Sequence, residues 1–206
     1  MHLTNREFYD IPYIVIDEYY NDSELDLIWE ELEFFTYSHK LKDPETTQEA
    51  YHGAKKNSGL FLDQVWSGQR ELSNILTVNR KIFKELDILR QNPSWFFKHF
   101  ECTSDTTLLS YYEDGGYYKP HRDNFAVTML SWFYKKPKVF EGGNLRFHMG
   151  SDFEEITVVN NRTVIFPSCL IHSVTPIFME DQYQRQKLGR YCLTQFLRYQ
   201  DLANSD

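Results

Sequence analysis

The chain has 206 residues, of which 41% are hydrophobic and 25% charged, and it carries a formal net charge of −8. This length and composition fit one folded domain with a sizeable core, and they exclude wholesale disorder. The acidic balance argues against duplex nucleic acid as a partner, because phosphate binding needs clustered Lys and Arg. The three cysteines are odd in number and share no CxxC spacing, which argues against a disulfide framework and a cysteine-ligated zinc site.

No secretory signal is visible at the start of the sequence, and no apolar run approaches the ~20 residues that a bilayer-spanning helix needs. We therefore expect a cytoplasmic protein with no membrane partner. Aromatic residues make up 17% of the chain. Because aromatic side chains favour strands and bury a large area, this content predicts a β-rich core.

The N-terminal part of the chain contains both strand and helix patterns. The β-branched run Ile11–Asp17 predicts a strand. Capping residues followed by apolar residues at helical spacing predict an amphipathic helix over 23–36, and a second helical stretch is predicted over 72–89. Between them, the polar segment 38–60 predicts a long loop, for which a lid over a substrate and a plain surface loop are equally good interpretations.

From about residue 96 onward, short apolar or alternating runs are separated by turn signals rich in Gly, Asn and Pro. The strands predicted from these runs cover 107–112, 126–134, 143–147, 156–159, 162–166 and 190–197. Several short strands at nearly regular spacing indicate a sandwich or jelly roll, with the two helices backing one sheet face. We expect a single domain over 1–206, with a helical, lid-bearing part at 1–95 and a β core at about 96–200.

The sequence His121-Arg-Asp123 is the first candidate for chemistry, because alternation along a strand points its two outer side chains the same way. Such pairs also arise by chance, as a surface histidine beside a solvated aspartate. His172 follows an apolar run, where a lone histidine is often a satisfied core residue. Together, however, two imidazoles and one carboxylate form the facial ligand set of non-haem iron oxygenases.

Arg190 opens an otherwise apolar strand. A guanidinium buried at such a position needs a partner, and its planar fork matches a carboxylate. The alternative is a salt bridge to one of the 30 acidic residues of the chain.

The order of these residues resembles that of the Fe(II)/2-oxoglutarate-dependent oxygenases, most closely the prolyl 4-hydroxylase-like branch. The segment Tyr112–His121 is similar to that branch's approach to the first metal ligand, and Glu141–Arg146 to its Gly-Gly-x-Leu strand start. The resemblance covers residues 107–199. It implies a mainly β (α+β) fold, in which a double-stranded β-helix, or jelly-roll, core packs against N-terminal helices.

The resemblance also implies roles for individual residues. The catalytic metal ligands for Fe(II) would be His121, Asp123 and His172, and Arg190 would bind the distal carboxylate of 2-oxoglutarate. Other residues expected at the co-substrate are Tyr112, Thr194 and Trp132. Trp132 stands where the family often has tyrosine; it can donate a hydrogen bond but not accept one, and the alternative is that it belongs to the core. Ascorbate is the expected reductant.

The function implied is a dioxygenase that couples oxidative decarboxylation of 2-oxoglutarate to succinate with hydroxylation of a C–H bond. The expected substrate is a prolyl residue in a peptide or protein. One alternative is the same chemistry on a free amino acid or small metabolite. Another is a non-catalytic jelly-roll module that binds a metal or ligand. Nucleic-acid repair by the same chemistry is opposed by the net charge and by Phe196, which stands where repair relatives tend to carry a second arginine.

Overall fold

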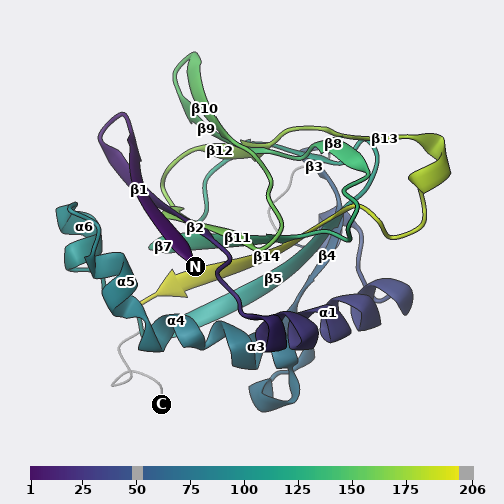
Figure 1. Cartoon of the computed structure of the whole chain (residues 1–206), viewed down its shortest axis with the longest axis horizontal. Coiled ribbons are helices and arrows are strands. Elements are labelled where there is room, and N and C mark those ends of the chain that lie inside the picture. The colour runs from purple at the N-terminus through teal and green to yellow at the C-terminus, as the bar shows by residue number, and fades with distance from the viewer. Residues whose placement is uncertain (48–52, 200–206) are drawn as a thin grey trace.

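Two β-sheets lie face to face in the computed structural model, which describes residues 1–47 and 53–199, and helices cover the outer face of the larger sheet (Figure 1). The larger sheet has the order β1 (His2–Phe8), β2 (Ile11–Asp17), β11 (Arg162–Pro167), β7 (Val127–Phe133), β14 (Arg190–Arg198), β5 (Ser104–Tyr112) and β4 (Ser58–Phe61). Its neighbouring strands are antiparallel throughout.

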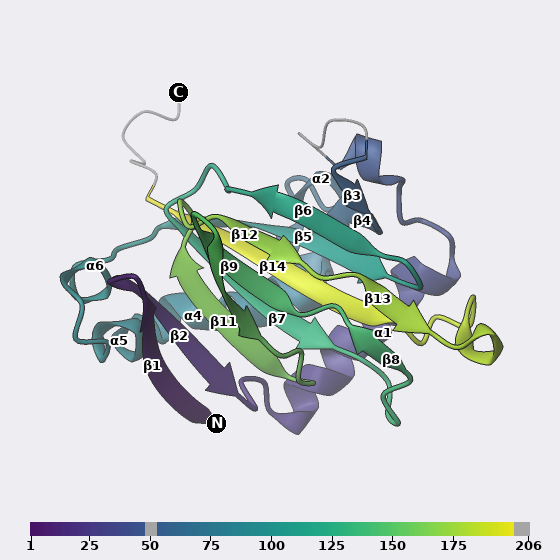
Figure 2. The ribbon, with the colours of Figure 1, turned by 90° about the horizontal axis from the view of Figure 1, so that it is seen from above.

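The smaller sheet lies across the larger one when the molecule is seen from above (Figure 2). Its order is β10 (Asp152–Ile156), β9 (Leu145–Met149), β12 (His172–Val174), β6 (Tyr117–His121) and β3 (Lys55–Lys56). A separate pair is formed by β8 (Phe140–Gly142) and β13 (Ile177–Met179). The predicted jelly-roll core with flanking helices is therefore confirmed.

The helices are α1 (Asp22–Tyr37), α2 (Leu62–Val65), α3 (Asn74–Asn79), α4 (Lys81–Lys84), α5 (Leu86–Arg90) and α6 (Trp95–Lys98), with short 3-10 turns at 44–46, 70–72 and 181–183. The predicted helix over 23–36 is confirmed as α1. It begins with a capping box, because Asn21 accepts the amide hydrogen of Glu24 and the Glu24 carboxylate accepts that of Asn21.

The prediction of one helical stretch over 72–89 is wrong in detail. The segment is divided into α3, α4 and α5, and the backbone leaves helical geometry at Glu85, with φ −112° and ψ 18°. Several of its apolar residues are nevertheless buried, among them Ile75, Ile82 and Leu89, whereas Leu72 is exposed. Short turns in place of one straight helix let all of these side chains reach the same curved sheet.

The prediction that 38–60 is a loop is also wrong in part. Its last residues form β3 and the start of β4, which extend both sheets by pairing with β6 and β5. Positions 48–52 lie outside the described residues. Most later strands are confirmed to within about two residues, but the strand expected at 156–159 ends at Ile156 as β10. The additional strands β1, β6, β8, β12 and β13 were not predicted.

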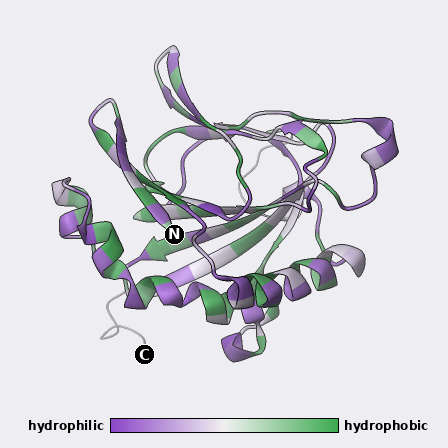
Figure 3. Ribbon diagram, viewed as in Figure 1, coloured by the Kyte–Doolittle hydropathy of each residue, from purple (hydrophilic) through white to green (hydrophobic). Residues whose placement is uncertain are grey.

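The central strands β7, β11 and β14 of the larger sheet are buried on both faces, whereas the edge strand β1 is largely exposed. Figure 3 shows the hydropathy of the residues along the ribbon. Along β2, Ile14 and Ile16 pack in the core beneath the helices, whereas Tyr13 and Val15 pack in the core between the sheets. The prediction that helices back one sheet face is confirmed. The face toward the smaller sheet is left to form the interior of the barrel.

One buried carboxylate joins two of these helices. Glu31 of α1 accepts hydrogen bonds from the Trp66 indole at 3.0 Å, the Ser73 hydroxyl at 2.9 Å and the Ile75 amide at 2.7 Å. These contacts hold the start of α3 against α1.

We predict that Glu31→Ala lowers the free energy of unfolding by about 2–4 kcal/mol, because it leaves three donors without an acceptor. Urea unfolding followed by circular dichroism measures the change. Glu30→Ala is the control, because Glu30 is exposed and bonds only to the Asn74 amide. A Glu31 variant as stable as the Glu30 variant would show that the buried contacts are not needed.

Candidate active site

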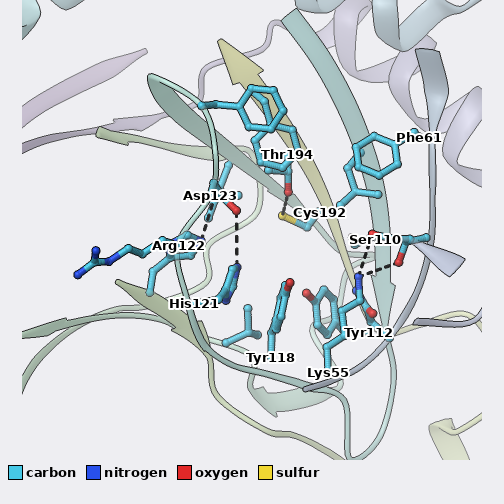
Figure 4. Close-up of a pocket in the computed structure, with 18 of the residues that line it drawn as sticks. Lys55, Phe61, Ser110, Tyr112, Tyr118, His121, Arg122, Asp123, Cys192 and Thr194 are labelled. Atoms are coloured by element: carbon cyan, nitrogen blue, oxygen red, sulfur yellow. Dashed lines mark hydrogen bonds and ion pairs between the residues drawn. The ribbon is translucent and has the colours of Figure 1, made fainter. Parts of the chain in front are cut away.

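Two histidines face each other across the smaller sheet. His121 of β6 and His172 of β12 are direct partners in the antiparallel register, and their ring centroids lie 4.2 Å apart. An Asp123 carboxylate oxygen lies 3.4 Å from the His172 Nε2 atom, and the other lies 3.8 Å from the His121 Nε2 atom. One ligand atom from each of the three residues thus falls within 4.8 Å of the others, on one side of the pocket (Figure 4).

Backbone carbonyls set the orientation of both imidazoles. The Nδ1 atom of His121 lies 2.9 Å from the Lys119 carbonyl oxygen, and that of His172 lies 2.9 Å from the Leu170 carbonyl oxygen. A carbonyl only accepts, so each Nδ1 carries the proton and each Nε2 keeps its lone pair free. Burial lowers the pKa of each imidazole to about 4, so both are neutral at pH 7, in the form that ligates metal.

Asp123 reaches this point by a different route from the one that strand alternation predicts. Strand β6 ends at His121, so Asp123 lies beyond it in a loop. Its amide donates to the Ser168 carbonyl at 3.1 Å, and its carboxylate accepts from the Thr128 hydroxyl at 2.7 Å. Burial raises the pKa of the carboxyl, and a cation bound at this point would oppose that shift. Strand β7 is apolar except for Thr128 and Ser131, and a buried polar residue in such a strand needs a partner. This pattern is the signal in the sequence by which Thr128 could have been found.

Arg190 is the most unusual side chain of the site. It is completely buried, and its Nε, Nη1 and Nη2 atoms have no hydrogen-bond partner among the described residues. The guanidinium carbon lies 4.9 Å from the centre of the Tyr112 ring and 5.5 Å from that of Trp132. Cation–π contacts offset only part of the cost of burying a charge. A buried, unpaired guanidinium therefore indicates a missing anion.

Two glycines lie next to this arginine or next to the strand that faces it. Gly143 has φ +69°, and a Cβ atom there would lie 3.0 Å from the Arg190 Cδ atom. A Cβ atom on Gly189 would lie 2.1 Å from the Tyr112 carbonyl oxygen. A side chain at either position would displace Arg190 or the strand that faces it.

A cavity of about 250 Å³ connects the histidines and the arginine. Of the residues predicted from the sequence, those that line it are His121, Asp123, His172, Arg190, Tyr112 and Thr194. Alternation along β14 points Arg190, Cys192 and Thr194 toward it. Trp132 is fully buried beside Arg190 but does not line the cavity, and its indole nitrogen has no partner among the described residues.

Several further residues of the cavity were not predicted. Among them are Lys55, Asn57, Phe61, Ser110 and Phe125. Phe196 also lines the cavity, although the sequence singled it out only as the position where nucleic-acid repair relatives tend to carry arginine. Burial raises the pKa of the Tyr112 hydroxyl, which keeps its proton and can donate. The donor set fits the groups that the resemblance implies: two neutral imidazoles and a carboxylate suit Fe(II), and the unpaired guanidinium suits a carboxylate of 2-oxoglutarate.

Known proteins are similar to this chain in sequence. The sequence profile of the 2OG-Fe(II) oxygenase superfamily matches residues 107–198. An uncharacterised PKHD-type hydroxylase from Synechocystis is 30% identical over 98 residues, which are 39% of this chain and 32% of that protein. The likeness to the 2OG-Fe(II) oxygenase superfamily thus covers the part of the chain that carries the three candidate ligands and Arg190. The chain spans about a third of the length of the curated relative it matches.

Solved structures of superfamily members share the fold. A prolyl 4-hydroxylase from Pseudomonas putida matches with a TM-score of 0.58 and 15% identity, over 92% of this chain and 93% of that one. A prolyl hydroxylase from Trichoplax adhaerens, in complex with a hypoxia-inducible factor peptide, matches with a TM-score of 0.64 and 15% identity, over 90% and 83%. The fold of this chain is therefore prolyl 4-hydroxylase-like. None of the helices in the described part of the chain is both long and apolar enough to cross a bilayer.

The three candidate ligands make a direct prediction about metal binding. His121→Ala, Asp123→Ala and His172→Ala should each weaken Mn(II) binding at least 100-fold, because each removes one of the three candidate ligands. Electron paramagnetic resonance of free Mn(II) measures the affinity. His148→Ala is the control, since His148 bonds to the Ser173 hydroxyl and lies outside the cluster. Binding that survives all three substitutions would place the metal elsewhere.

Arg190 makes a prediction with two opposite effects. Arg190→Met should weaken 2-oxoglutarate binding about 100-fold while Mn(II) binding persists, because the carboxylate loses its partner. The same variant, without ligand, should be at least as stable to heat as the wild type, because an unpaired buried charge is gone. Calorimetric titration and thermal unfolding measure the two effects. Arg198→Met, at the exposed end of β14, is the control. Unchanged co-substrate affinity in Arg190→Met would remove Arg190 from the site.

Proposed function

We propose that this protein is an Fe(II)- and 2-oxoglutarate-dependent dioxygenase that hydroxylates a C–H bond, and that its substrate is a prolyl residue in a peptide or protein. The observation that carries the proposal is the unpaired Arg190 guanidinium in the same cavity as the His–Asp–His cluster. A structural metal site needs no such cation, so the non-catalytic binding module is the weaker interpretation.

When bound, iron and 2-oxoglutarate supply the oxidation: dioxygen and 2-oxoglutarate are consumed, succinate and carbon dioxide are released, and one substrate C–H becomes C–OH. In this proposal His121, Asp123 and His172 hold the iron. Arg190 binds the distal carboxylate of 2-oxoglutarate, and Tyr112 donates to the same co-substrate.

The remaining predicted residues complete the co-substrate site. In the proposal Trp132 donates its indole hydrogen and Thr194 its hydroxyl, and the apolar walls between the sheets exclude water from the bound groups. Ascorbate serves as the reductant. We propose that residues 1–206 act as one catalytic domain, because strands β1 to β4 complete both sheets around the cavity.

An apolar wall supports a prolyl substrate. Phe61, Phe125 and Phe196 line the same cavity, and the Phe125 and Phe196 rings stack with centroids 4.5 Å apart. Such a wall suits the apolar ring of proline. The Trichoplax neighbour binds a peptide, as its complex with the hypoxia-inducible factor fragment states. Phe196 stands where nucleic-acid repair relatives tend to carry a second arginine, and this difference also disfavours a nucleic-acid substrate.

We predict that the protein forms succinate from 2-oxoglutarate in the presence of Fe(II) and ascorbate, and that a pool of proline-containing peptides raises the rate several-fold. Product quantification by mass spectrometry measures both succinate and a 16 Da increase in a peptide. His172→Ala is the control for metal-independent decay. Iron-loaded protein that forms no succinate under any condition would contradict the proposal and favour the binding module.

A further inference from the structure

A second buried cation lies in the cavity, on the side away from His121 and Asp123 (Figure 4). Lys55 of β3 is only 5% exposed. Its ammonium donates to the Thr47 hydroxyl at 2.7 Å and to the Thr47 carbonyl at 3.3 Å. Both partners are neutral. The Tyr118 ring centre lies 5.3 Å from the ammonium, and the charge of Glu45 opposes the effect of burial by raising the pKa of Lys55.

The ammonium retains capacity for another partner. An ammonium has three hydrogens to donate, and the two bonds to Thr47 use two of them. Burial lowers the pKa of Lys55 to about 8, so the amine still holds its proton at pH 7. The third hydrogen of a charged group that is 5% exposed needs an acceptor, and an anionic acceptor would bind most strongly.

The charges of the cavity point to the same conclusion. Its lining contains two buried cationic side chains, Lys55 and Arg190, and one carboxylate, Asp123, although the whole chain carries a net charge of −8. Fe(II) brings two positive charges and 2-oxoglutarate brings two negative charges, so loading both leaves the excess of positive charge unchanged. A third bound group that is anionic would reduce it.

A nearby acceptor adds a second contact. Asn57 lines the cavity two residues after Lys55, and its Oδ1 atom is buried with no partner among the described residues. Arg122 is exposed, and its side chain extends away from the pocket in Figure 4. An anionic group next to an N–H or O–H donor would therefore satisfy both Lys55 and Asn57, while Arg122 favours its approach.

We propose that Lys55 is a specificity-determining residue that binds a carboxylate of the primary substrate, so that the enzyme selects acidic substrates. This proposal rests on the proposed function, because it assumes that Arg190 holds the co-substrate. The carboxylate has two possible sources, the α-carboxylate of a free amino acid and a glutamate side chain beside the reacting proline of a peptide. The apolar ring would then pack on Phe61 and Phe196.

Calorimetric titration of the protein loaded with Mn(II) and 2-oxoglutarate at pH 7 tests the proposal with two pairs of probes. The first pair is L-proline and L-prolinamide. The second is an acetylated and amidated Gly-Pro-Glu peptide and its Gly-Pro-Gln counterpart. In one pair the carboxylate member should bind wild type more tightly than the amide member, and Lys55→Met should weaken it about 10- to 100-fold. The pair that responds identifies the source of the carboxylate.

Lys56→Met is the matched control. Lys56 is the next residue of the same strand, but it is exposed and its ammonium bonds to the Asp114 carbonyl outside the cavity. Its substitution should change neither pair. Lys55→Gln serves as a second variant that keeps a hydrogen-bond donor, and circular dichroism establishes that each variant is folded.

Two results would overturn the proposal. The first is that neither carboxylate probe binds wild type better than its amide partner. The second is that Lys55→Met weakens 2-oxoglutarate binding before any probe is added, which would assign Lys55 to the co-substrate. Failure of the proposed function has a different signature: the wild type, loaded with Fe(II) and given either probe pair, forms no succinate.

Discussion

The burial of Arg190 without an anionic partner is the constraint on which the active site depends. A guanidinium in the interior destabilises the fold unless something in the functional state compensates it. The surrounding residues tolerate the cation without neutralising it: two aromatic rings face it, and the absence of a side chain at Gly143 leaves it room. We interpret this arrangement as a preorganised carboxylate site, in which the charge is in place before the co-substrate arrives.

The two sheets place this cation and the metal ligands in one cavity. Arg190 comes from the larger sheet, whose outer face is covered by the helices, whereas both histidines come from the smaller sheet. The register of β6 with β12 brings the histidines together, and carbonyls of their own strands and loops orient the rings. Strand pairing thus positions both histidines and Arg190, and the hydrogen bonds of Asp123 to Ser168 and Thr128 hold its carboxylate beside the histidines.

The sequence allowed the ligand set, Arg190 and the jelly-roll class to be predicted, because these depend on residue types in a fixed order. It did not reveal β3 and β4, whose short polar segments become strands only by pairing with β6 and β5, far away in the chain. For the same reason Lys55 was not recognised: an isolated lysine gives no sign of burial until its strand is placed. The position of Asp123 depends on Thr128 and Ser168, which strand alternation does not describe.

A crystal structure of the protein grown with Mn(II) and 2-oxoglutarate would test whether Arg190 binds the co-substrate beside the metal. We expect one metal ion bound by His121, Asp123 and His172, and a 2-oxoglutarate carboxylate paired with Arg190, while Lys55 remains available to a substrate. A metal ion bound elsewhere, or a co-substrate carboxylate on Lys55 with Arg190 still unpaired, would contradict this expectation.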